Sequence, residues 1–374
     1  MKFDTYRLSD LAEIKYGKNQ RKVVDDDGSV PIYGTGGLMG YANQALYDKP
    51  SVLIGRKGTI DRVKFVDHPF WTVDTLFYTK INDEIVIPKY LYYAMSLLDL
   101  MKYNEGTTIP SLRTETLNRL ELSIPSLAYQ EEILSILVPI EEKIKNNEEI
   151  NKNLVQQAQT IYQSWFVDFD PFGGYAPLEW SKTTLGEIAF IKTDSWSPAK
   201  NPDVIVEHYS IPAFDEKHYP VFEVASGIKS NKYMLTKNSL MISKLNPDTK
   251  RIWRPLCLSE HPVCSTEFIV YEAKKEGQKD YIYSIIDSLP FFNHLCSHTT
   301  GSTNSRQRAT PKSTLDFSLV LPPDCLIEEF CNIVTPIYDM IAANTVENQS
   351  LSGVRDSLLP KLMSGEINVS DLSI

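Results

Sequence analysis

Apolar residues recur at alternating intervals of four and three residues in two long segments of the chain. The first series contains Ile133, Leu137, Ile140, Ile144, Leu154, Ala158, Ile161 and Trp165. The second contains Phe330, Val334, Ile337, Ile341, Leu351, Leu358 and Leu362, with Arg355 at one position of the same face. This spacing is typical of a coiled-coil seam, in which an apolar stripe of each helix packs against a partner helix. The pattern predicts two long, paired helices.

Asparagine interrupts each apolar series at two positions. Asn147 and Asn151 occupy these positions in the first segment, and Asn344 and Asn348 occupy them in the second. An asparagine in a seam lowers stability but fixes register, because its amide needs a polar partner in the facing layer. Since both segments carry such a pair, we expect the two helices to pack on each other, antiparallel, with the four asparagines setting their register.

The segments before the two helices predict globular units of mixed strand and helix, and their parts recur in the same order. These parts are entry strands at 11–14 and 185–188, β-rich runs at 51–58 and 239–245, aromatic stretches at 70–78 and 263–271, helices at 88–100 and 280–289, and closing strands at 122–125 and 317–323. The long helices are expected to open near Tyr129 and Leu326, and Pro360 is expected to kink or end the second one.

The order of these parts predicts an α+β fold with a pseudo-twofold internal repeat. Two globular α/β domains, residues 1–125 and 171–322, are expected to be separated by a long antiparallel two-helix coiled coil. Residues 126–170 and 323–374 form the two helical spacers of that coiled coil in this interpretation. The link 168–177, with the sequence DFDPFGGYAP, is rich in proline and glycine and marks the join between the halves.

The net charge of −10 is unevenly distributed, which changes what it implies about partners. The spacers hold most of the excess acid: residues 126–170 carry 3 basic and 8 acidic side chains, and residues 323–374 carry 2 and 8. The globular segments are therefore nearly neutral, and each can carry a basic face. No apolar run approaches the roughly 18 residues of a membrane span, and the five cysteines include no Cys-x-x-Cys pair, so a cytoplasmic protein without a membrane or metal site is expected.

The sequence lacks the motifs of several enzymes that act on DNA. Asn246-Pro247-Asp248 and Asn201-Pro202-Asp203 match only half of an adenine methyltransferase loop, and there is no Walker A lysine motif. A nuclease could use Glu272 and Lys274 with Asp248 upstream, but that combination is common by chance. The sequence therefore offers no convincing motif for methyl transfer, ATP use or DNA cleavage by this chain.

Polar and basic loops recur in both halves and provide the candidate binding residues. Arg, Lys, Asn, Ser and Thr are side chains that reach base edges and phosphates, so a nucleic acid is the expected ligand. Arg56 and Lys57 are matched with Lys244, and Arg113 is matched with Arg308. The candidate DNA-binding residues are Tyr33, Thr35, Arg56, Lys57, Thr107 and Arg113 in the first half and Lys244, Asn304, Arg306 and Arg308 in the second.

Several longer strings resemble the specificity subunit of a type I restriction–modification system, and together they span nearly the whole chain. In the first half they are PIYGTGGLMGYAN, VLIGRKGTI, PFWTVDTLFY, SIPSLAYQEEI and QTIYQSWFVDF. In the second they are LMISKLNP, LVLPPDCLIEE and RDSLLPKLMSGEI, of which the last is highly specific for the helical regions of that family.

The resemblance implies a non-catalytic subunit of a DNA adenine methyltransferase and restriction enzyme, a system that defends cells against foreign DNA. Each globular domain would read one half of an interrupted site in double-stranded DNA, and the helices would fix the distance between the halves. Two methyltransferase (modification) subunits would dock on the spacers, and restriction subunits that translocate DNA could join them. S-adenosylmethionine, ATP and magnesium would be bound by those partners, with no cofactor on this chain.

Two alternatives remain open from the sequence. The coiled coil alone could be functional, in a scaffold or interaction protein without DNA specificity. The chain could also serve a methylation-only system that lacks a restriction subunit.

Overall fold

The structure, a computed structural model, describes residues 2–300 and 307–371. The chain divides into two compact units, one formed by Met1–Lys143 and Ser350–Ile374 and the other by Ile144–Gln349. Each long helix contributes to both units. The expected division into 1–125, 126–170, 171–322 and 323–374 is a different partition of the chain and stays a prediction.

In the first unit, a four-stranded antiparallel sheet carries the elements that lead to the candidate loops. Its order is β2 (Ala12–Tyr16), β8 (Leu76–Ile81), β5 (Ser51–Gly55) and β6 (Val63–Val66). A second sheet has the order β4 (Gly37–Ala42), β3 (Val30–Gly34) and β7 (Trp71–Thr72), and β1 (Phe3–Arg7) pairs with β9 (Glu121–Pro125). The short helices are α1 (Leu8–Leu11), α2 (Pro88–Ser96) and α3 (Thr114–Asn118), with a 3-10 turn at Leu100–Tyr103.

The second unit repeats this topology with different elaborations. Its four-stranded sheet has the order β11 (Ala189–Lys192), β19 (Phe268–Ala273), β16 (Leu240–Ser243) and β17 (Ile252–Trp253), and β10 (Ser181–Thr184) pairs with β22 (Ser318–Leu321). The remaining sheet is larger than its counterpart, with the order β12 (Ser195–Trp196), β15 (Lys232–Met234), β18 (Pro262–Ser265), β13 (Ile205–Tyr209) and β14 (Val221–Val224). The short strands β20 (Thr299–Thr300) and β21 (Arg308–Ala309) pair with each other, and β21 holds the candidate residue Arg308. Its short helices are α5 (Leu185–Ile188), α6 (Ile211–Lys217), α7 (Lys279–Asp287), α8 (Leu289–Ser297) and α9 (Pro311–Thr314).

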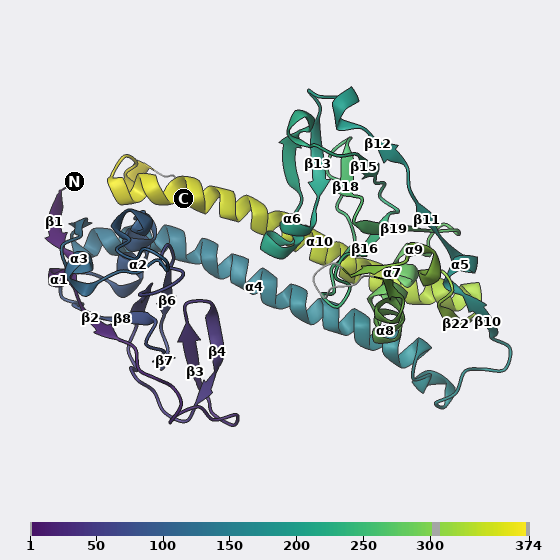
Figure 1. Cartoon of the computed structure of the whole chain (residues 1–374), viewed down its shortest axis with the longest axis horizontal. Coiled ribbons are helices and arrows are strands. Elements are labelled where there is room, and N and C mark those ends of the chain that lie inside the picture. The colour runs from purple at the N-terminus through teal and green to yellow at the C-terminus, as the bar shows by residue number, and fades with distance from the viewer. Residues whose placement is uncertain (1, 301–306, 372–374) are drawn as a thin grey trace. The chain divides into compact units, whose positions relative to one another are not determined.

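The two long helices are α4 (Leu127–Phe166) and α10 (Asp324–Ser364), drawn in blue-teal and yellow-green in Figure 1. In the first unit, Ile133 and Leu137 of α4 share a core with Leu362 and Met363 of α10. In the second, Tyr162 and Phe166 pack on Phe330, at ring-centroid distances of 6.1 and 5.1 Å. Early residues of one helix thus meet late residues of the other within each unit, so the helices run antiparallel. The expected fold class, mixed α and β with paired long helices, is confirmed.

Three details differ from the sequence-based expectation. Leu185–Ile188 is a helical turn rather than a strand, and its counterpart is Leu8–Leu11, three residues earlier than the match we expected. The helix α8, which holds His294 and Cys296, is not among the elements that the sequence predicts. Helix α10 continues past Pro360 to Ser364, so the expected end there is wrong. Because Leu362 and Met363 are buried in the first unit's core, their packing stabilises the turn that follows the proline.

None of the helices in the described ranges is both long and apolar enough to cross a membrane.

Candidate functional site

The candidate loops of the first unit meet at the end of β5. After Gly55 the chain turns through Arg56, Lys57 and Gly58, and the 104–113 loop lies alongside this turn. The N–H of Leu112 donates to the Arg56 carbonyl at 3.0 Å, and the N–H of Gly58 donates to the Pro110 carbonyl at 2.9 Å. The sheet thus brings together two basic turn residues and a polar loop that lies about 50 residues later in the chain.

The 104–113 loop is closed by its own side chains. Asn104 Oδ1 accepts the N–H groups of Gly106 and Ser111, both at 2.9 Å. A Cβ at Gly106 would lie 1.9 Å from the carbonyl oxygen of Ile109, so only glycine fits this turn. The closed loop exposes Thr107 and Ile109 at its tip.

The cations around this loop are held to different degrees. Arg56 is half-buried, its Nη1 donates to the Asp74 carbonyl at 2.6 Å, and its Cζ lies 5.3 Å from the centroid of the Tyr16 ring. Arg113 is 70% exposed, and its Nε lies 3.1 Å from Glu105 Oε2. Lys57 is exposed. Arg56 is therefore anchored in the loop, whereas Lys57 and the ion-paired Arg113 are exposed to solvent, from which a ligand would approach.

The second unit builds the same arrangement after β16. The N–H of Lys244 donates to the Glu267 carbonyl, and the Lys244 carbonyl accepts from Ala309, both at 2.9 Å. The corresponding bonds in the first unit join Arg56 to the Thr75 carbonyl and to the N–H of Leu112. The expected match of the Arg56–Lys57 turn with Lys244 is therefore confirmed by hydrogen bonding.

Arg308 makes two hydrogen bonds to one carboxylate, whereas Arg113 of the first unit makes a single contact to Glu105. Its Nε and Nη2 donate to the two carboxylate oxygens of Glu267 at 3.0 and 3.1 Å, although its side chain is 46% exposed. This ion pair raises the pKa of Arg308, with the hydrogen bond as the larger cause. A bidentate carboxylate fixes the plane of a guanidinium and leaves its outer edge open to an incoming acceptor.

The expected match of Arg113 with Arg308 is wrong by two residues. Leu245 bridges to Arg308 as Lys57 bridges to Ser111, so Arg308 corresponds to Ser111. Arg113 occupies the N-cap position of α3, and Thr310 occupies the N-cap position of α9. The residues that follow Lys57 and Leu245 support the same alignment. Gly58 and Asn246 both have a positive φ, of 89° and 48°. The two units therefore present their arginines from different positions of one scaffold.

The other described candidates, Tyr33 and Thr35, belong to β3 and the turn after it rather than to these turns. Tyr33 is 8% exposed, and its hydroxyl lies 3.3 Å from Nε2 of His68, so its ring supports neighbours rather than facing solvent. Burial raises the pKa of Tyr33. Thr35 lies in the turn between β3 and β4. Asn304 and Arg306 lie outside the described residues.

The four seam asparagines meet in the second unit. Asn147, 1% exposed, donates from Nδ2 to Glu347 Oε2 at 2.7 Å and to Asn348 Oδ1 at 2.8 Å. Asn344 Nδ2 donates to Asn151 Oδ1 at 2.8 Å. The amides of Asn151 and Asn348 also reach the facing backbone, at Ile341 and Ile144. The polar layer thus joins α4 to α10, while its role in setting register stays a prediction.

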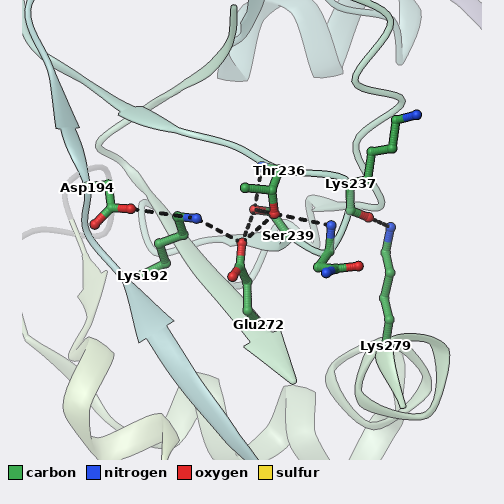
Figure 2. A network of polar contacts seen from close by, with 8 residues as sticks. Lys192, Asp194, Thr236, Lys237, Ser239, Glu272 and Lys279 are labelled. Carbon is green, nitrogen blue, oxygen red and sulfur yellow. Dashed lines mark hydrogen bonds and ion pairs between the residues drawn. The ribbon is translucent and has the colours of Figure 1, made fainter. Parts of the chain in front are cut away.

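The residues of the nuclease hypothesis do not form one cluster. Figure 2 shows Glu272 surrounded by Lys192, Thr236 and Ser239, which place donor atoms 3.2, 2.6 and 2.8 Å from its Oε1. Burial raises the pKa of Glu272, but these hydrogen bonds outweigh it and leave the pKa lowered. Lys274 donates elsewhere, to the Gly186 carbonyl at 2.6 Å. Glu272 and Asp248 lie beyond opposite ends of β16. Glu272 has a structural role, because its hydrogen bonds join its strand to Lys192, Thr236 and Ser239.

Sequence reasoning missed the carboxylates that hold the two arginines. Glu105 stands eight residues before Arg113, and Glu267 stands 41 residues before Arg308. Glu267 lies in the turn before β19, and only the alignment of β19 with β16 brings it to the second loop. No local pattern in the sequence marks such a residue.

Comparison with known proteins gives consistent matches. Residues 1–156 match the family described as Type I restriction modification DNA specificity domain. The Type I restriction enzyme MjaIX specificity subunit of Methanocaldococcus jannaschii is 24% identical over 353 residues, which cover 87% of this chain and 80% of that protein. The HindI specificity subunit of Haemophilus influenzae is 23% identical over 389 residues, which cover 82% of this chain and 84% of that protein.

One solved structure is similar over nearly the whole chain. The crystal structure of the type I restriction–modification S subunit from M. genitalium has a TM-score of 0.65 and 17% sequence identity, covering 97% of this chain and 96% of that one. At this identity the match shows a shared fold.

Proposed function

Because this chain has the sequence and fold of a type I restriction–modification specificity subunit, we propose that it reads a bipartite, interrupted DNA target. The first target-recognition segment binds one half-site, and the second binds the other. The observation that carries the proposal is the pair of equivalent turns after β5 and β16, which share backbone hydrogen bonds but present different cations. Two unlike reading loops on one repeated scaffold suit a target whose halves differ in sequence.

The remaining parts of the proposal concern the partners. Methyltransferase subunits dock on the paired helices and carry the chemistry, with S-adenosylmethionine bound there; restriction subunits with ATP and magnesium join the same assembly. This chain supplies sequence recognition and no catalytic group. The resemblance of its spacers to those of the family, and the loops' content of Arg, Lys and Thr, support this division of labour.

The assembled methyltransferase, incubated with a random DNA library, is expected to select a two-part motif with a fixed gap. The isolated chain should bind the same DNA only weakly at physiological salt, because its net charge is −10 and phosphate neutralisation supplies most non-specific affinity. The measurement is sequencing of bound sites together with a titration of both samples. Nanomolar specific binding by the isolated chain contradicts the second expectation, and absence of any motif favours a scaffold without DNA specificity.

Substitution of the loop arginines should affect one half-site at a time. Arg113→Ala is expected to relax one base, or to lower affinity, in the first half-site, and Arg308→Ala to do so in the second. A bidentate arginine–guanine contact contributes about 1–3 kcal/mol of discrimination. Each variant complex methylates a library in which both half-sites vary, and the two motifs are compared with those of the wild type.

Lys102→Ala is the matched control, since the Lys102 side chain is 75% exposed and lies in the first unit outside these turns. An equal change in both half-sites, or no change with either arginine variant, contradicts the assignment.

A further inference from the structure

A cavity of about 440 Å³ lies beside the candidate loop of the first unit. One wall is the turn between β3 and β4, and the other includes β6 and the segment before it. Its lining residues include Thr35, Gly36, Gly37, Thr59, Arg62 and Lys64. The volume lies within the range of about 300–1,000 Å³ that is typical of ligand sites.

The glycine wall leaves room for a ligand to approach the backbone. A Cβ at Gly36 or Gly37 would meet no atom within 4 Å, so the turn faces open space. Gly37 has a φ of 114°, a conformation that favours glycine. The turn therefore forms a low wall without side chains, and the hydroxyls of Thr35 and Thr59 lie within the same lining.

The charged side chains of the lining are cations, with no carboxylate among them. The Lys64 ammonium lies 4.0 Å from the centroid of the Tyr33 ring, which holds it in place. Within the described residues it makes no ion pair, and Arg62 has only a long contact, 4.0 Å from its Nε to Asp61 Oδ2. Partial burial lowers the pKa of Lys64, which has no counter-ion among the described residues although its side chain remains exposed. A bound anion would supply that missing partner.

The cavity is continuous with the candidate DNA-binding turn. A Cβ at Gly58 would lie 3.8 Å from the Thr35 hydroxyl, and Thr59, the next residue, lines the cavity. The cavity therefore lies next to the turn that carries Arg56 and Lys57. Strand β6 is paired with β5 along its length, so Lys64 is carried on the same rigid sheet as that turn.

We propose that this cavity holds a sugar–phosphate unit of the DNA backbone, with Lys64 and Arg62 bound to the phosphate. The inference rests on the proposed function, and it adds positioning residues to the first half-site. Phosphate contacts fix the position of a protein on the duplex and carry no base information. Lys64 and Arg62 thus set where the reading loop sits, while Arg113 discriminates bases.

Lys64→Gln in the assembled complex should weaken binding to cognate and random DNA by the same factor. The slope of log affinity against log salt concentration is expected to fall by about one unit, because one phosphate contact is lost. Arg62→Gln should behave alike. Gly36→Val keeps every charge but narrows the cavity, and it is expected to weaken binding to both DNAs.

Lys80→Gln is the matched control. Lys80 is an exposed lysine on β8 of the same sheet, with its Nζ 5.9 Å from the centroid of the Tyr47 ring, and it does not line the cavity. This variant should keep the wild-type slope and affinity. A Lys64→Gln complex that matches the control, or that changes a preferred base with an unchanged slope, overturns the phosphate site. Failure of the wild-type complex to bind any selected DNA would instead contradict the proposed function.

Discussion

Removal of one heptad from each long helix should shorten the gap between the two half-sites by about three base pairs. The deletion takes residues 148–154 from α4 and residues 341–347 from α10, which face each other because Asn147 bonds Asn348 and Asn151 bonds Asn344. Seven helical residues rise about 10.5 Å, and DNA rises about 3.4 Å per base pair. Since seven residues are one repeat of the seam, the apolar stripes stay in contact.

The measurement is a methylation map of the variant complex on a library with gaps of every length. A deletion of 148–154 from α4 alone is the control, and it should abolish methylation because the two seams no longer match. The converse change, one extra heptad in each helix, should lengthen the gap by the same amount. A double-deletion complex that methylates efficiently at the wild-type gap shows that the helix pair does not set target spacing.

The long helices could be predicted because their pattern repeats over many turns. They begin at Leu127 and Asp324, each two residues before the expected start near Tyr129 and Leu326. The apolar repeat predicts where the body of each helix lies. The first turn precedes the first apolar residue of the seam, so the repeat does not mark the residue at which the helix begins. The asparagine pairs were also predictable, since an amide in an apolar seam has few partners other than its counterpart.

Helix α8 was not predicted, and it begins at the end of the helix expected over 280–289, with Pro290 in its first turn. Proline is tolerated in the first helical turn, where the N–H it lacks would have no partner. Here Pro290 lies in that turn, and Ser288 caps it by accepting the N–H of Phe291 at 3.4 Å. The sequence therefore contains a helix-capping signal, Ser-x-Pro, at Ser288–Pro290.

The candidate loops were located by sequence, but their internal order was not. Arg308 was matched with Arg113 because both are arginines in polar loops. The backbone hydrogen bonds of Lys244 and Arg56 show instead that Arg308 is the equivalent of Ser111 in the other repeat. The cavity at Lys64 was also missed. Lys64 is a single lysine in a strand pattern, and its missing counter-ion is a property of the folded sheet.

Replacement of Asn147 alone by leucine should lower the free energy of unfolding by about 1–3 kcal/mol, because two hydrogen bonds are lost and each contributes about 0.5–1.5 kcal/mol. Asn147 is 1% exposed and donates to both Glu347 and Asn348, so the variant removes a donor from the centre of the polar layer. The measurement is chemical denaturation of the chain. Lys145→Leu, an exposed change on the same helix, is the control and should leave stability nearly unchanged.

Replacement of all four asparagines by leucine should have the opposite effect on stability. With Asn147, Asn151, Asn344 and Asn348 changed together, no amide is left unpaired and the seam becomes continuously apolar. Exchange of a buried polar cluster for packed apolar residues often raises stability by about 1–4 kcal/mol. Thermal unfolding of the quadruple variant should therefore occur at a higher temperature than that of the wild type, whereas the single variant unfolds at a lower one.

The quadruple variant should also lose its unique register, because a slipped alignment no longer buries an unpaired amide. Cysteine pairs test this directly. Leu154→Cys with Ile341→Cys reports the native alignment, and Leu154→Cys with Val334→Cys reports an alignment shifted by one heptad. Wild-type helices should cross-link only with the first pair, and the leucine variant with both. If the leucine variant cross-links only in the native alignment, the asparagines do not set the register and their layer must be retained for another reason, such as contact with a partner chain.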